Sequence, residues 1–261
     1  MIRPAVFATV ALLLSGCATL TSSSRFEPLD RAAAIGVEDP RVVFLAGALA
    51  TTAGWRHSLV GAARVRLEAP KLSFSRPQRI AVMRPASLRV EILGLFDQVV
   101  AVLATDGTRY HFFDASKPGI EEGELESGLL WQVARIDLEP EEAVSLLLGA
   151  PLDPSSVLES AGSLDDGALL LAFRSAKDGS RRVFDFDGSG RLARVRQRAA
   201  DGLLVWEARY SDYRARGESV FAHGIEIDFP AQGARASFHF RTAELNRDLS
   251  SRAFVLEEAS R

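Results

Sequence analysis

The sequence of 261 residues contains a single cysteine, Cys17. A disulfide framework and a thiolate metal site are therefore excluded. Basic and acidic residues nearly balance, and the formal net charge of −3 gives no electrostatic case for binding nucleic acid. Beyond residue 16 no apolar run is long enough for a bilayer-spanning helix, so none is predicted there.

Sequence patterns typical of catalysis are also missing. The chain contains no P-loop, no Rossmann glycine pattern and no G-x-S-x-G turn. His57, His111, His223 and His239 are not spaced as metal ligands on a helix, and none lies in an HExxH motif. The sequence therefore predicts a binding or transfer protein, with no metal and no cofactor, and not an enzyme.

The N-terminus is organised around the single cysteine. Arg3 precedes an apolar run over residues 6–14, which is too short to span a bilayer and is typical of a signal peptide. Leu14, Ser15, Gly16 and Cys17 resemble the lipobox of bacterial lipoproteins. The resemblance implies cleavage before Cys17 and lipidation of its sulfur. The alternative is an ordinary signal peptide or anchor with an incidental cysteine.

The remaining chain divides into a tether and one domain. Residues 1–16 are predicted to be the signal peptide, 17–39 the lipidated cysteine with a flexible, Ser- and Thr-rich tether, and 40–261 a single domain. Asp39 and Pro40 mark a helix start, with an apolar stripe continuing to about residue 55. A second helix is expected over residues 138–148, closed by Gly149.

Alternating apolar and polar residues predict a sheet. Strands are expected over residues 63–68, 87–93, 98–105 and 108–114, with two short stretches separated by Pro77 between the first two. Residues 115–128 are expected to be a loop with at most one short strand. Six further strands are expected over residues 169–175, 181–187, 192–198, 203–212, 220–229 and 234–245.

The two faces of this sheet differ. One face is charged, with Arg194, Arg196 and Arg198 on one strand, and is expected to be a solvated surface of cross-strand ion pairs. An arginine ladder meeting anionic lipid headgroups remains the alternative. The other face is apolar and must curl around a cavity or a packed core. The expected fold is mainly β (α+β), an unclosed antiparallel barrel with a helical lid.

The order of these parts resembles the LolA/LolB-like superfamily of bacterial lipoprotein carriers and receptors. The resemblance rests on residues 61–66, 88–92, the Gly94-Leu95-Phe96 turn, the strands of 99–114 and the helix of 141–149. It implies an unclosed barrel whose apolar cavity holds acyl chains. Because Cys17 lies in a lipobox-like motif, the chain is more similar to the outer-membrane receptors of the superfamily than to the soluble carriers.

The resemblance also implies where the chain acts. It predicts a monomer anchored to the outer membrane, facing the periplasm, whose partners are membrane lipid through Cys17, lipoprotein acyl chains and a periplasmic LolA-like carrier. Leu95 and Phe96 are the candidates for membrane insertion, unless both pack into the core. The alternative function is a structural or assembly lipoprotein with a packed interior. The predicted cavity lining comprises Val65, Leu67, Val90, Ile92, Val144, Leu147, Leu148, Trp206, Phe229 and Phe238.

Overall fold

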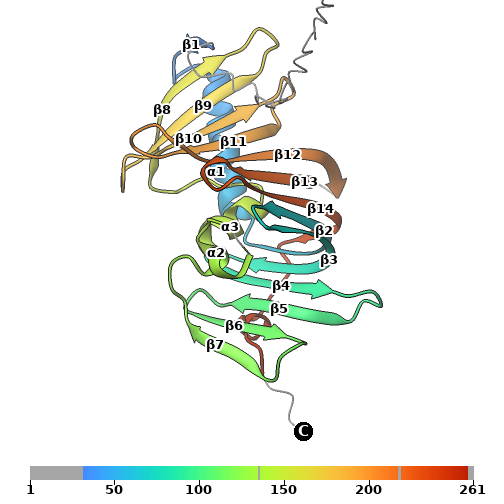
Figure 1. Cartoon of the computed structure of the whole chain (residues 1–261). Coiled ribbons are helices and arrows are strands. Elements are labelled where there is room, and N and C mark those ends of the chain that lie inside the picture. The colour runs from blue at the N-terminus through green and yellow to red at the C-terminus, as the bar shows by residue number, and fades with distance from the viewer. Residues whose placement is uncertain (1–31, 135, 217–218, 258–261) are drawn as a thin grey trace, which may run out of the picture.

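A single antiparallel sheet of 14 strands forms the body of the protein (Figure 1). The computed structural model describes residues 32–134, 136–216 and 219–257. The strand order is β1-β8-β9-β10-β11-β12-β13-β14-β2-β3-β4-β5-β6-β7, so the chain forms two meanders joined where β14 pairs with β2. β1 and β7 are the outer strands and do not pair with each other, so the barrel is unclosed, as predicted.

The first meander follows the N-terminal helix. Its strands are β2 (Ser58–Ala69), β3 (Leu72–Met83), β4 (Ser87–Leu93), β5 (Val99–Thr105), β6 (Arg109–Asp114) and β7 (Ile120–Glu124). The second meander adds β8 (Ser156–Ser163), β9 (Leu169–Ser175), β10 (Arg181–Phe186), β11 (Leu192–Arg198), β12 (Leu204–Arg216), β13 (Ser219–Phe229) and β14 (Ala234–Leu245). The short strand β1 (Ala33–Ile35) pairs with β8.

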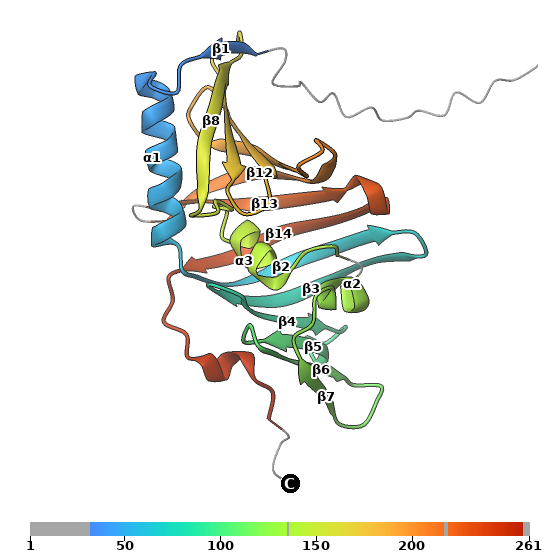
Figure 2. The same ribbon diagram turned by 90° about the vertical axis from the view of Figure 1, so that its left-hand side faces the viewer.

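In the part of the chain that the structure describes, three α-helices accompany the sheet. α1 (Pro40–Trp55) stands beside the second meander, and α2 (Leu129–Ala134) and α3 (Pro140–Leu147) lie on the inner face of the sheet (Figure 2). Asp39 caps α1 as predicted: its carboxylate accepts a hydrogen bond of 2.9 Å from the Arg41 backbone N–H. Val42, Leu45 and Leu49 are the buried residues of α1, which agrees with the expected stripe.

The structure differs from the sequence-based elements in four places. β3 runs unbroken through Pro77, where two short stretches were expected. β4 pairs only with Gln78–Met83 of β3, so at Pro77 the edge of β3 that faces β4 has no neighbouring strand. Proline has no backbone N–H to donate, and this unpaired edge is where a strand can accommodate it. β8 and α2 were not predicted, and Ala33–Ile35 forms a strand inside the segment expected to be a tether.

The core lies on the inner face of the sheet. Val65 on β2 faces Phe238 on β14, and Leu67 faces Ala236, which in turn faces Ile227 on β13. α3 contacts β3 and β4 from the inner side. On the outer side, the short 3-10 helix Ser251–Phe254 packs on β4, and Phe254 is fully buried. The apolar residues of the first meander thus gather between the sheet and the two lid helices.

Candidate functional site

An apolar cavity of about 190 Å³ lies between the inner face of the first meander and the helices α2 and α3. The sheet contributes residues from β2 to β6, β13 and β14, and the lid contributes Leu130 of α2, Ile136, Leu138, and Ala143 and Leu147 of α3. Among the lining residues whose side chains the structure describes, Gln78 is the single polar one. The sheet residues are Val65, Leu67, Phe74, Gln78, Leu88, Val90, Ile92, Ala101, Leu103, Phe112, Ile227, Ala236 and Phe238.

The predicted lining residues fall into two groups. Val65, Leu67, Val90, Ile92, Leu147 and Phe238 border the cavity. Val144, Leu148, Trp206 and Phe229 are buried in the core but do not border it. Trp206 and Phe229 belong to β12 and β13, on the side of the second meander, whereas the cavity extends toward β6. Leu88, Leu103 and Phe112 also border the cavity and were not among the predicted lining residues. The alternation of apolar and charged residues on β4 had nevertheless placed Leu88 on the apolar face.

The helix α3 is held at both ends by buried polar contacts. At its C-terminal end, Arg56 Nη1 donates a hydrogen bond of 2.9 Å to the Leu148 carbonyl, and Arg84 Nη2 donates one of 3.1 Å to Ala150. The Tyr210 hydroxyl donates to the Leu146 carbonyl at 3.1 Å. Cationic groups at a helix C-terminus are favoured by the helix dipole. These contacts fix α3 as one wall of the cavity.

The N-terminal turn of α3 is held by an ion pair. Arg182 Nη2 on β10 lies 2.7 Å from Glu142 Oε1, and the Arg182 guanidinium also lies over the Trp206 ring at 5.0 Å. Burial raises the pKa of Glu142 above its ordinary value, and the Arg182 charge opposes that rise. The pair therefore ties the lid to the second meander at the cost of burying a carboxylate.

The turn between β4 and β5 carries two nearly fully exposed apolar side chains. Leu95 is 86% exposed and Phe96 is 89% exposed, so neither packs into the core. The turn is well defined: Gly94 N–H donates to the Gln98 carbonyl at 2.8 Å, and Phe96 N–H donates to Gln98 Oε1 at 2.8 Å. A short, hydrogen-bonded turn thus presents adjacent Leu and Phe side chains to the surroundings.

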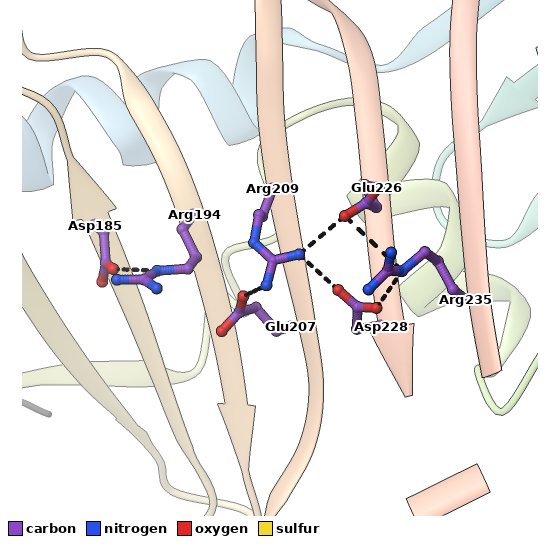
Figure 3. Close-up of polar contacts among 7 residues, drawn as sticks. All are labelled: Asp185, Arg194, Glu207, Arg209, Glu226, Asp228 and Arg235. Atoms are coloured by element: carbon purple, nitrogen blue, oxygen red, sulfur yellow. Dashed lines mark hydrogen bonds and ion pairs between the residues drawn. The ribbon is translucent and has the colours of Figure 1, made fainter. Parts of the chain in front are cut away.

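The charged outer face is a network of cross-strand ion pairs, partly buried (Figure 3). Arg194 Nε and Arg196 Nη2 each lie 2.6 Å from an oxygen of Asp185, and Arg198 donates to the Gly202 carbonyl. These contacts favour ion pairing over a free arginine ladder. The expectation of a fully solvated face was wrong, because the Arg196 side chain is only 1% exposed.

A second cluster of charges continues this network across β12, β13 and β14. The Arg209 guanidinium lies between Glu207 on its own strand and Glu226 and Asp228 on β13, and Asp228 also contacts Arg235 (Figure 3). Burial raises the pKa of Glu207, and the Arg209 charge opposes the rise. Each carboxylate in this cluster has an arginine partner, and the three carboxylates share two guanidinium groups, those of Arg209 and Arg235.

The remaining predicted features concern metals and the membrane. In residues 32–134, 136–216 and 219–257, no three His, Cys, Asp or Glu side chains gather into a possible metal site. In the same ranges no helix is both long and apolar enough to cross a bilayer. Leu14, Ser15, Gly16 and Cys17 lie outside the described residues, so lipidation of Cys17 stays a prediction.

Solved structures with a similar fold are found, although no match is found at the level of sequence. No family model matches the sequence, and no curated protein matches it. Similar solved structures include a LolA superfamily protein from Nitrosomonas europaea, with 16% identity, a TM-score of 0.55, and coverage of 81% of this chain and 97% of that one. A putative outer membrane lipoprotein-sorting protein domain from Vibrio parahaemolyticus has 11% identity, a TM-score of 0.56 and coverage of 81% and 95%. A DUF1329 family protein from Desulfovibrio piger has 13% identity and the same TM-score and coverage.

The architecture is that of an unclosed antiparallel half-barrel that encloses an apolar cavity beneath a helical lid. It is similar to these solved structures over nearly their whole length, with TM-scores of 0.55 and 0.56. The chain therefore has a LolA/LolB-like fold, as its sequence predicted.

Proposed function

We propose that this protein is a lipid-anchored outer-membrane protein that binds acyl chains of lipoproteins in its cavity and helps to place them in the membrane. The observation that carries the proposal is the apolar cavity beneath α2 and α3. Each methylene group kept out of water is worth about 0.8 kcal/mol. A protein that moves a lipid between membranes therefore needs an apolar enclosure, and this chain encloses one.

The size of the cavity indicates how it would accept a chain. An apolar cavity of about 150 Å³ is large enough for benzene, and the cavity here has about 190 Å³. It holds a short run of methylene groups as it stands, and a full acyl chain requires the lid to move. α3 is fixed by Arg56, Arg84 and Arg182, so α2 is the part of the lid that we expect to shift.

Two further features support placement at a membrane. Burying Leu95 and Phe96 in lipid is worth about 1.5–3 kcal/mol for each side chain, and both are already exposed on one turn. The lipobox-like motif at Cys17 supplies a covalent anchor in the proposal. The solved structure from Vibrio parahaemolyticus is described as a putative outer membrane lipoprotein-sorting domain, which agrees with this role. No catalytic step is part of the proposal.

Filling the cavity tests the proposal. Ala101 lines the cavity on β5, and Ala101→Phe places a ring in that space. We expect the chain from Ala18 onward, purified without lipid, to bind a fluorescent acyl probe, and Ala101→Phe to weaken that binding about tenfold. Ala48→Phe, on the exposed face of α1, is the matched control and should bind as the unchanged chain does.

The alternative of an assembly lipoprotein with a packed interior predicts a different result. A scaffold of that kind would bind no acyl probe, and Ala101→Phe would alter only its stability. Failure of the unchanged chain to bind any acyl probe would therefore contradict acyl-chain binding and favour the scaffold.

A further inference from the structure

Gln78 is a polar side chain placed in an apolar cavity. It lies on β3, is 4% exposed, and is the single polar residue among the described residues that line the cavity. Its register partners are Ala63 on β2 and Ile92 on β4, so no polar side chain stands opposite it on either neighbouring strand. Within the ranges that the structure describes, its carboxamide forms no hydrogen bond, whereas the side chains of Gln98, Gln197 and Gln232 do.

An amide in this position carries a cost that packing does not explain. Burying a carboxamide without a partner typically costs free energy, and buried polar side chains are therefore almost always hydrogen-bonded. A leucine would fill a similar volume and suit the surrounding residues. Apolar ligand sites, in contrast, commonly contain a few polar groups that orient the ligand. The carboxamide of Gln78 is suited to that role because it offers both donors and an acceptor.

The same face of β3 also carries a free charge. Side chains alternate along a strand, and Arg76 lies directly opposite Val65, so it shares the inner face with Phe74 and Gln78. Arg76 is exposed and forms no ion pair within the described ranges. It lies about 7 Å along the strand from Gln78, on the side of the β2–β3 turn. Gln78 and Arg76 are therefore adjacent polar positions on this face, and Phe74, the next residue of the face, borders the cavity again.

We propose that Gln78 is a specificity residue that donates a hydrogen bond from Nε2 to the carbonyl oxygen of an acyl ester or acyl amide. The inference rests on the proposed function and names the part of the ligand that is recognised. The polar end of the ligand points along β3 toward Arg76, and its methylene groups lie over Leu88, Leu103 and Phe112. An alkyl chain without a carbonyl group gains nothing from Gln78.

Substitution of Gln78 combined with a change of ligand tests this. Gln78→Leu removes the hydrogen-bonding groups with little change in volume, and Gln132→Leu, on the exposed side of α2, is the matched control. Three competitors of equal chain length would displace a fluorescent acyl probe from the delipidated chain: a monoacylglycerol, an N-acyl peptide and a glycerol alkyl ether. The first two distinguish an ester from an amide source.

We expect Gln78→Leu to bind the ester or the amide about three- to tenfold more weakly, the usual effect of one neutral hydrogen bond. Binding of the ether should be unchanged or tighter. We also expect the ligand-free variant to melt at the same temperature or a higher one, because a buried amide without a partner has been removed. Gln132→Leu should leave all three affinities unchanged.

Each other result would overturn the inference. An equal loss for all three competitors, or no loss for any, would show that Gln78 does not recognise the carbonyl, while leaving acyl-chain binding intact. A lower melting temperature of ligand-free Gln78→Leu would show that the carboxamide serves the fold. If the unchanged chain binds none of the three competitors, the proposed function fails together with this inference.

Discussion

Single charged residues determine how the lid helix α3 is attached. Arg56 and Arg84 are partly or largely buried, and burial lowers the pKa of each guanidinium, yet both use backbone carbonyls as partners instead of carboxylates. A carbonyl partner has no protonation state in the accessible pH range. The C-terminal attachment of α3 is therefore insensitive to pH, whereas the carboxylate of Glu142 at its N-terminal turn can take up a proton.

Replacing Glu142 should change how stability depends on pH. Burial raises the pKa of Glu142 in the folded chain, so the folded state binds its proton more readily than the unfolded state. The contribution of this residue to stability is therefore largest at low pH and is lost as pH rises through the ordinary carboxyl pKa of about 4.3 toward the raised value. Glu142→Gln lacks this titration, although it leaves Arg182 without its carboxylate at every pH.

The quantity to measure is the difference in unfolding free energy between the unchanged chain and Glu142→Gln, from denaturant titrations at pH 4 and pH 7. We expect the advantage of the unchanged chain to be smaller at pH 7 than at pH 4. An advantage that grows with pH would contradict the raised pKa.

At the scale of elements, the sequence predicted those with a clear period and missed those without one. β4 follows strict alternation in Ser87–Leu93 and was predicted at its observed bounds. α2 has only six residues, fewer than two turns, so no 3.6-residue period could reveal it. β8 mixes small and polar residues and is shifted by a bulge near Glu159, which breaks its alternation. Its position depends on pairing with β1 and β9.

The cavity lies on the inner face of the sheet, but alternation alone does not set its extent, for a similar reason. Alternation assigns residues to that face, and Val65, Val90 and Phe238 border the cavity. It does not tell which inner residues are covered by packing from the second meander. Trp206 and Phe229 are inner residues that are fully covered in this way and do not border the cavity. The lid residues Leu130 and Ile136 belong to a segment without a detectable pattern.

The 3-10 helix Ser251–Phe254 is an element whose attachment can be tested by one substitution. Phe254 is fully buried, and Arg89 Nη1 donates a hydrogen bond of 3.1 Å to the neighbouring Ala253 carbonyl. We expect Phe254→Ala to lower the unfolding free energy by about 3–5 kcal/mol, the usual effect of removing a buried phenylalanine ring. Denaturant unfolding measures this.

Val255→Ala is the control for that substitution, because Val255 is only half-buried. It should cost about 1 kcal/mol or less. A loss below about 1 kcal/mol for Phe254→Ala would contradict the expectation and would mean that the C-terminal segment contributes little to the stability of the sheet.

At the scale of the whole molecule, the exposed turn and the cavity lie in the same meander. The turn joins β4 and β5, both of which line the cavity with Val90, Ile92 and Leu103. A membrane contact made by Leu95 and Phe96 would therefore be one strand length or less from the lipid that the cavity is proposed to hold. The second meander, with α1, contributes the wall that anchors α3.

This arrangement predicts that the turn, and not general surface hydrophobicity, determines binding to lipid. In sedimentation with phospholipid vesicles, the chain from Ala18 onward, without its lipid anchor, should bind weakly. Leu95→Glu removes one inserted side chain, worth about 1.5–3 kcal/mol, and adds a charge that must stay in water, so we expect binding to weaken about tenfold or more.

Phe44→Glu is the matched control, since Phe44 is 72% exposed but lies on α1. Equal losses for Leu95→Glu and Phe44→Glu would contradict a specific role of the turn. Unchanged melting temperatures for both variants would assign the loss to membrane contact, because neither side chain packs into the core.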